Sequence, residues 1–233
     1  MDIVTPFDFV AEFADGKKVA VIGNAPTLEG SGLGAWIDSH DIVVRFNDCR
    51  VTGYEKDVGA RTEILVCNPY AETRPDRRVG DAVSPRMVVV ITPMTRRGVK
   101  ADFERWIGDY PVLFSYAPDI QIDCGDRRKI SLTTGTYGLV LMAKLLKPAA
   151  MSVTGFTMFS PGTDFHYWSS VTPSGVKAHT PATEAGIFAD ILNSFGFPVT
   201  ITPEIRQIFQ SSGRTVGRRV REYGKRSWFG RVR

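Results

Sequence analysis

The chain has 233 residues, of which 43% are hydrophobic and 11% aromatic, and its formal net charge is +4. This length and composition suit one globular domain with a sizeable core. No apolar run approaches the roughly 20 residues of a membrane span, and the first residues lack the basic and apolar regions of a signal peptide. The three cysteines, Cys49, Cys67 and Cys124, lack metal-ligand spacing, so we expect reduced thiols in a cytoplasmic protein.

Apolar, β-branched runs alternate with helical patterns along the chain. In order, we predict helix 8–14, strand 19–23, helix 34–39, strands 42–46, 63–68 and 87–92, helix 100–108, strand 112–115, helix 135–146, strand 151–155, helix 181–194 and strand 198–202. Several of these strands are almost wholly apolar, as central strands covered on both faces are. The alternation predicts an α/β fold: a single Rossmann-like domain with a mostly parallel, seven-stranded twisted sheet flanked by helices.

Asparagines stand where the first two of these strands end, at Asn24 and Asn47. The carboxyl ends of parallel strands share one edge of a sheet, where ligands bind. Two amides there could bond a ribose, a base or a phosphate, or each could simply form a turn. The glycine-rich loop after the first strand reads G-x-G-x-G, which disfavours a dinucleotide-binding oxidoreductase.

Two further segments carry groups suited to anion binding and proton transfer. Thr133, Thr134 and Gly135 lead into an apolar helix, so this start is either an anion site or a capped core helix. His166 and His179 are two of the three histidines of the chain. His179 precedes Thr180, a predicted helix cap, where the positive helix end disfavours the imidazolium and leaves a neutral base.

Four segments, taken in order, resemble the motifs of the sialyltransferases of glycosyltransferase family 29. Residues 19–62 resemble the long motif L, which contains Gly23-Asn24 and the segment VRFN that ends at Asn47. Residues 133–156 resemble motif S, His166-Tyr167-Trp168 resembles motif III, and His179 with Glu184 matches the H-x4-E of motif VS. Where Golgi members of the family join motifs L and S by a disulfide, this chain has Val19 and about Leu146. Ser169 stands where motif III often has an acid or an amide, and motif S has extra residues near position 147.

The resemblance implies a variant of the GT-A fold and an inverting, metal-independent transfer of sialic acid, or a related keto-sugar acid, from a CMP donor to a glycan hydroxyl. No cofactor or metal is expected, and no D-x-D pair is present. The catalytic residues would be His179, as general base, and His166, on the donor phosphate. The donor-binding residues would be Asn24, Asn47, Thr133, Thr134, Gly135, Gly155, Phe156 and Tyr167. For Phe156, core packing is the alternative interpretation. We expect His40 to be structural, and Arg45 and Arg61 to brace the motif L loops by pairing with acids.

Basic residues gather at the end of the chain, where residues 213–233 hold eight Lys or Arg and one acid. We therefore predict a catalytic domain over residues 1–212 and a basic tail over residues 213–233. Aromatic residues among the cations suit an anionic membrane surface, such as the inner face of a bacterial membrane where a lipid-linked glycan acceptor is elongated. A solvated tail is the alternative, and nucleic acid is an unlikely partner.

Two other functions remain open at this point. A CMP-Kdo-type transferase would share the donor nucleotide and differ in the sugar. A catalytically silent scaffold protein would keep the CMP site without turnover.

Overall fold

The most apolar segments of the chain form the middle of one sheet. The computed structural model describes residues 2–69, 78–92, 103–117, 120, 132–158, 166–169 and 180–224. Within these ranges, β2 (Lys18–Ile22), β3 (Ile42–Phe46), β4 (Ile64–Cys67) and β5 (Met87–Thr92) are buried along nearly their whole length. Strands covered by helices on both faces need such continuous apolar runs.

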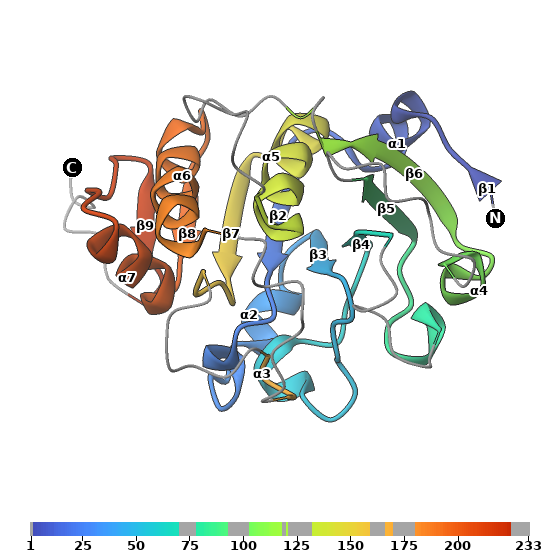
Figure 1. Ribbon diagram of the computed structural model, residues 1–233, viewed down its shortest axis with the longest axis horizontal. Coiled ribbons are helices and arrows are strands. Elements are labelled where there is room, and N and C mark those ends of the chain that lie inside the picture. Colours follow the sequence, from blue (N-terminus) through green and yellow to red (C-terminus); the bar gives the residue numbers. More distant parts are fainter. Residues whose placement is uncertain are drawn as a thin grey trace, which may run out of the picture.

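The sheet contains nine strands in the order β1-β6-β5-β4-β3-β2-β7-β8-β9, and every neighbouring pair is parallel (Figure 1). The remaining strands are β1 (Asp2–Ile3), β6 (Pro111–Tyr116), β7 (Ala150–Thr154), β8 (Val199–Ile201) and β9 (Val220–Glu222). The strand order reverses between β2 and β7. From β2 the chain proceeds outward through β3, and it later returns to the other side of β2 as β7.

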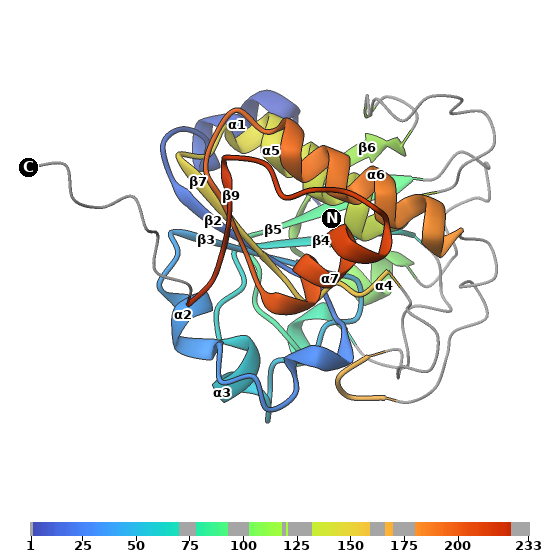
Figure 2. The same ribbon diagram turned by 90° about the vertical axis from the view of Figure 1, so that its left-hand side faces the viewer.

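Helices cover both faces of the sheet, as Figure 2 shows with the sheet seen between them. One face packs against α1 (Pro6–Phe13), α5 (Thr134–Leu146), α6 (Pro181–Ser194) and α7 (Pro203–Ser211). The other packs against α2 (Gly34–Asp38), α3 (Glu55–Val58) and α4 (Phe103–Ile107). Successive residues of β2 alternate between the two cores, as the two-residue period of a strand requires.

All seven predicted strands and all five predicted helices occur, with ends shifted by a few residues. The predicted sheet is corrected in two respects: it has nine strands rather than seven, and it is wholly rather than mostly parallel. The two additional strands, β1 and β9, lie at the edges and have only two and three residues, too few to give a readable pattern. The predictions also missed α7, although Ile205, Ile208 and Phe209 follow helical spacing.

The two positions where the resemblance implies a disulfide in Golgi members of the family hold apolar residues in this chain. Val19 and Leu146 are both buried in the core on the α5 face of the sheet. Among the described helices, none is both long and apolar enough to cross a bilayer.

The basic segment of residues 213–233 contains the edge strand β9 of the sheet. β9 lies beyond the predicted boundary at residue 212 and pairs in parallel with β8. Arg214 forms an ion pair of 3.0 Å with Asp190 of α6, whose carboxylate raises the pKa of the arginine. Residues up to 224 therefore contribute structure to the domain, and residues 225–233 lie outside the described ranges.

The backbones of β2 and β7 come together closely just after both strands end. Gly23 donates to the carbonyl of Thr154 at 2.8 Å, and Ala25 donates to the carbonyl of Gly155 at 2.9 Å. A Cβ atom on Gly23 would lie 2.0 Å from the Gly155 oxygen, and Gly155 itself has a φ of +74°. Only glycine satisfies both positions, so this pair fixes the point where the strand order reverses.

We expect Gly23→Ala to destabilise the protein by about 3 kcal/mol, because its Cβ would collide with a backbone that cannot yield. Chemical unfolding measures this change. Gly196→Ala is the matched control, because the added Cβ meets nothing within 4 Å. The control should be neutral or stabilise slightly. Equal unfolding free energies for the two variants would show that the close approach is not a constraint.

Candidate functional site

Polar side chains gather where β2, β3 and β4 end, beside the start of α5. Asn24, Asn47 and Asn68 each follow one of these strands by one or two residues. Gly155 and Phe156 follow β7 at the neighbouring position of the same edge. In an open parallel sheet, this edge at the reversal of strand order is where ligands bind.

Asn24 is oriented by a backbone carbonyl. Its side-chain Nδ2 donates to the carbonyl of Phe46 at 2.9 Å, and its own carbonyl accepts from the amide of Tyr167 at 3.2 Å. A carbonyl can only accept, so the contact identifies the amide nitrogen of the side chain. The Oδ1 atom has no hydrogen-bond partner among the described residues, and Asn24 is only partly buried. This side chain thus offers an acceptor to a ligand.

The side chain of Asn47 offers a hydrogen-bond donor, whereas that of Asn24 offers an acceptor. It adopts a left-handed backbone with φ 49°, which asparagine tolerates. Its Oδ1 accepts the backbone amide of Asn68 at 3.1 Å, so the oxygen is committed and Nδ2 is left as a donor. The sequence interpretation missed Asn68, although it follows an apolar strand as Asn24 and Asn47 do.

The start of α5 binds the carboxylate of Glu184, a residue of the same chain. Thr133 is the N-cap of α5, and its Oγ1 accepts from the amide of Thr136 at 3.2 Å. The Thr133 amide donates to Oε1 of Glu184 at 2.9 Å, and the hydroxyls of Thr133 and Thr136 donate to the same oxygen. Glu184 lies in the first turn of α6 and is 1% exposed. The donor groups of Thr133 are therefore engaged, which leaves Thr134 and Gly135 for a ligand.

Gly135, Gly155 and Phe156 form the apolar side of this edge. A Cβ on Gly135 would lie 2.8 Å from Cε1 of Phe156. Phe156 is buried and packs against Phe46 and Phe188, with ring centroids 5.8 and 5.2 Å away. The structure thus gives Phe156 the core-packing role that was the alternative in the sequence interpretation. The amide of Gly155 donates to Oε1 of Glu204 at 2.8 Å.

Residues 166–169 form a turn that lies against the end of β2. His166 and Ser169 exchange two backbone hydrogen bonds of 3.2 Å, and the His166 ring stacks on Trp168 with centroids 4.4 Å apart. Tyr167 is buried, which raises its pKa, and its hydroxyl bonds the backbone of Arg50 at both N and O. Tyr167 therefore anchors the turn that carries His166 to the backbone of Arg50 and to the backbone carbonyl of Asn24.

His179 lies outside the described residues. Thr180 occupies the N-cap of α6 and Pro181 the first helical position, as predicted. The expected side-chain cap is wrong, however, because Thr180 makes no capping hydrogen bond and is exposed. Of the predicted residues, the structure brings together Asn24, Asn47, Thr133, Thr134, Gly135, Gly155, Phe156, His166 and Tyr167.

The sequence model of glycosyltransferase family 29 (sialyltransferase) matches residues 11–101, which include the whole of motif L. Over this part of its sequence the chain is similar to the sialyltransferases of glycosyltransferase family 29. It is 27% identical over 200 residues to CMP-N-acetylneuraminate-beta-galactosamide-alpha-2,3-sialyltransferase 2 of Mus musculus, covering 76% of this chain and 53% of that protein. It is 39% identical over 75 residues to beta-galactoside alpha-2,6-sialyltransferase 2 of Homo sapiens, covering 32% of this chain and 14% of that protein.

Solved structures of low sequence identity share the fold. A mammalian sialyltransferase in complex with Gal-beta-1-3GalNAc-ortho-nitrophenol aligns with a TM-score of 0.53 at 18% identity, over 95% of this chain and 79% of that one. Monomeric CstII aligns with a TM-score of 0.52 at 12% identity, over 88% and 87%. The chain spans about half or less of the length of these curated family 29 relatives.

The segment that resembles motif L is braced largely by its own charged side chains. His40 is structural, as predicted: its Nε2 lies 2.7 Å from Oγ of Ser152, and its Nδ1 lies near two α2 carbonyls. Arg61 pairs with Glu63 at 2.8 Å, also as predicted. The predicted pairing of Arg45 with an acid is wrong, because its guanidinium donates to three backbone carbonyls and the Thr62 hydroxyl. Burial lowers the pKa of its guanidinium.

The glycine-rich loop of motif L is likewise held by the protein. The carboxylate of Asp57 accepts from the amides of Gly30 and Gly32 at 2.9 and 2.8 Å, and these bonds lower its pKa. Since these amides are engaged, the loop does not offer them to a phosphate.

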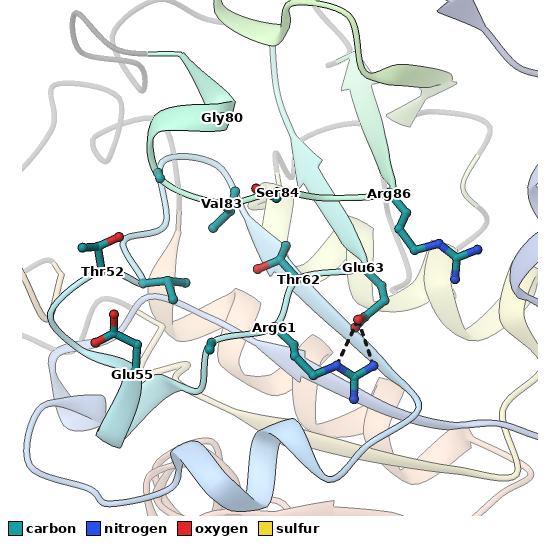
Figure 3. Close-up of a pocket in the computed structure, with 12 residues that line it drawn as sticks. Thr52, Glu55, Arg61, Thr62, Glu63, Gly80, Val83, Ser84 and Arg86 are labelled. Carbon is teal, nitrogen blue, oxygen red and sulfur yellow. Dashed lines mark hydrogen bonds and ion pairs between the residues drawn. The ribbon is translucent and has the colours of Figure 1, made fainter.

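Figure 3 shows a pocket of about 490 Å³. Its lining residues precede β4 and β5, so it lies at the end of β4 opposite to the asparagines. Its lining includes Arg61 and Glu63, which precede β4, and Arg86, which precedes β5. Arg61 is paired with Glu63, and Arg86 is paired with Glu12 at 2.6 Å. Its basic groups are thus satisfied internally. No group of three or more metal-binding side chains occurs in the described part of the chain.

We expect Glu184→Ala to lower the free energy of unfolding by about 3 kcal/mol, because two hydroxyls and one amide at the start of α5 lose their acceptor. Glu184→Gln keeps one oxygen and should cost about 1 kcal/mol. Urea unfolding of both variants measures the difference. The control is Glu29→Ala at an exposed position, which should change stability by less than about 0.5 kcal/mol. Equal losses for the alanine and glutamine variants would contradict the role of the oxygen.

Proposed function

We propose that the protein is an inverting sialyltransferase, a Rossmann-like variant of the GT-A fold, which moves sialic acid or a related keto-sugar acid from a CMP donor to a glycan hydroxyl. The observation that carries the proposal is the set of uncharged polar groups at the reversal of strand order in a chain similar to the family 29 sialyltransferases. Asn24, Asn47 and Thr134 stand there beside the turn that carries His166. The named relatives suggest a β-galactoside as the acceptor.

The polarity of these groups suits a nucleoside monophosphate. Asn24 offers a carbonyl oxygen, which can accept from a ribose hydroxyl or the amino group of cytosine. Asn47 offers an amide and Thr134 a hydroxyl, which can donate to phosphate or carboxylate oxygens. Thr134 is the first residue of α5, whose positive end favours an anion.

The proposed chemical step is a single displacement at the anomeric carbon. The acceptor oxygen forms a bond to that carbon on one face, while the bond to the CMP phosphate oxygen breaks on the other. His179 takes the proton of the acceptor hydroxyl, and CMP leaves with the electron pair. His166 and the donors at the start of α5 stabilise the charge on the departing phosphate.

The place of His179 in the sequence supports the proposal that it is the base. It directly precedes Thr180, the N-cap of the 14-residue helix α6. The positive end of such a helix disfavours an imidazolium ion and keeps the ring neutral near pH 7. A neutral imidazole is the form that can accept a proton from the hydroxyl.

We expect His179→Ala to lower transfer from CMP-sialic acid to a β-galactoside by about 10²–10⁴-fold, the usual contribution of a general base. CMP affinity, measured by calorimetry, should change by less than about 3-fold. Thr180→Ala is the control, because that side chain is exposed and makes no capping bond.

Full activity of His179→Ala would remove it from this role. If the wild-type protein binds CMP but turns over no CMP-sugar with any acceptor, it is a scaffold. If CMP-Kdo is the only CMP-sugar that is turned over, the protein is a Kdo transferase.

We also propose that the basic edge of the sheet contacts an anionic membrane surface. Arg218, Arg219 and Arg221 are exposed on and before β9, whereas Arg214 is paired with Asp190. Deleting residues 213–233 would remove strand β9 as well as the charges. Substitution of the arginines tests the charges alone. We expect replacement of these three arginines by glutamine to weaken sedimentation with phosphatidylglycerol vesicles by about 100-fold at low salt, since each contributes about 1 kcal/mol. Unchanged sedimentation would contradict the proposal.

A further inference from the structure

Asn68 links two groups of the proposed donor site. It follows β4 directly, since that strand ends at Cys67. Its backbone amide donates to Oδ1 of Asn47 at 3.1 Å. Its side-chain Nδ2 donates to Oγ1 of Thr134 at 3.1 Å. One residue thus contacts both a neighbouring strand end and the first residue of α5.

The contact with Thr134 determines how that hydroxyl can be used. A threonine hydroxyl has one proton to donate and two lone pairs that accept. Because Asn68 donates to Oγ1, the proton of Thr134 is not used in this contact. The Thr134 hydroxyl has no other hydrogen-bond partner among the described residues, so its proton is available to a ligand at the positive end of α5.

The backbone contact has the same effect on Asn47. The amide of Asn68 takes the Oδ1 of Asn47, and a backbone amide can only donate, so the Nδ2 group of Asn47 is left as the donor. Both groups that Asn68 touches therefore keep a proton with which to donate a hydrogen bond to a ligand. Phosphate oxygens are acceptors, and hydrogen bonds to a charged acceptor are the stronger kind.

We infer that Asn68 is a positioning residue that sets the hydrogen-bond polarity of the donor site, so that Thr134 and Asn47 both present protons to the donor phosphate. This inference rests on the proposed function, because it assumes that a CMP phosphate is the ligand. Asn68 acts through Thr134 and Asn47 rather than on the reacting atoms.

Asn68→Asp tests the inference, because aspartate has the same size but can only accept. Its carboxylate takes the proton of Thr134 and turns it away from the ligand. We expect the Kd for CMP, measured by calorimetry, to rise about 10-fold. Cytidine lacks the phosphate, so its affinity should stay within about 2-fold.

A double-mutant cycle separates this effect from simple charge repulsion. In a Thr134→Val background no hydroxyl remains to be turned. Asn68→Asp should then raise the Kd for CMP by less than about 3-fold. Asn193→Asp is the charge control, because Asn193 lies near the end of α6, where its side chain bonds the backbone of Thr215 and Gly217. It should leave the Kd for CMP unchanged, and thermal melting verifies that each variant is folded.

Three results would overturn the inference, and they are distinguishable. An unchanged Kd in Asn68→Asp shows that the polarity of Thr134 is not set by residue 68. The same loss in the wild-type and Thr134→Val backgrounds shows that residue 68 does not act through Thr134. If the wild-type protein fails to bind CMP at all, the proposed function fails and the inference falls with it.

Discussion

The backbone contact between Gly23 and Gly155 is the constraint on which the site depends. Both strands must end side by side at the reversal of strand order, and side chains larger than hydrogen would hold the two backbones apart. With the strands joined there, Asn24 reaches the carbonyl of Phe46 on β3. The amide of Gly155 in turn reaches the carboxylate of Glu204 at the start of α7. The polar edge is thus a product of main-chain geometry as much as of the polar residues themselves.

Two acids of the chain perform parallel tasks around this edge. Glu184 lies in the first turn of α6 and accepts three hydrogen bonds from the start of α5. Glu204 lies in the first turn of α7 and accepts from Thr154, Gly155 and Thr202. Each satisfies donors that would otherwise be buried without partners. Each also joins two segments that are distant in the sequence, which makes the edge rigid.

The fold could be predicted where a segment is long enough to show a clear apolar pattern. Long apolar strands such as β3 and β5 can be recognised in the sequence. The carboxyl ends of parallel strands share one edge of the sheet, and this rule correctly predicted that Asn24 and Asn47 lie at the same edge. Edge strands of two or three residues, such as β1 and β9, carry too little pattern to be found.

The details of the site depended on partners that a sequence does not reveal. Nothing near Thr133 in the sequence indicates that its amide and hydroxyl bond a glutamate on another helix. Likewise, the use of the Tyr167 hydroxyl follows from the backbone of Arg50, which comes from a loop after β3. Whether an amide side chain offers oxygen or nitrogen is decided by such distant contacts.

The parallel pairing of residue 22 with residue 154 has a consequence for synthesis. Strands β2 to β6 can associate while the remaining chain is still on the ribosome, since their pairings are comparatively local. β7 must then pair with the free side of β2, although several strands and helices separate the two in sequence, and such non-local contacts slow folding. We therefore expect a nascent chain to acquire most of its sheet before the polar edge beside β2 and β7 is complete.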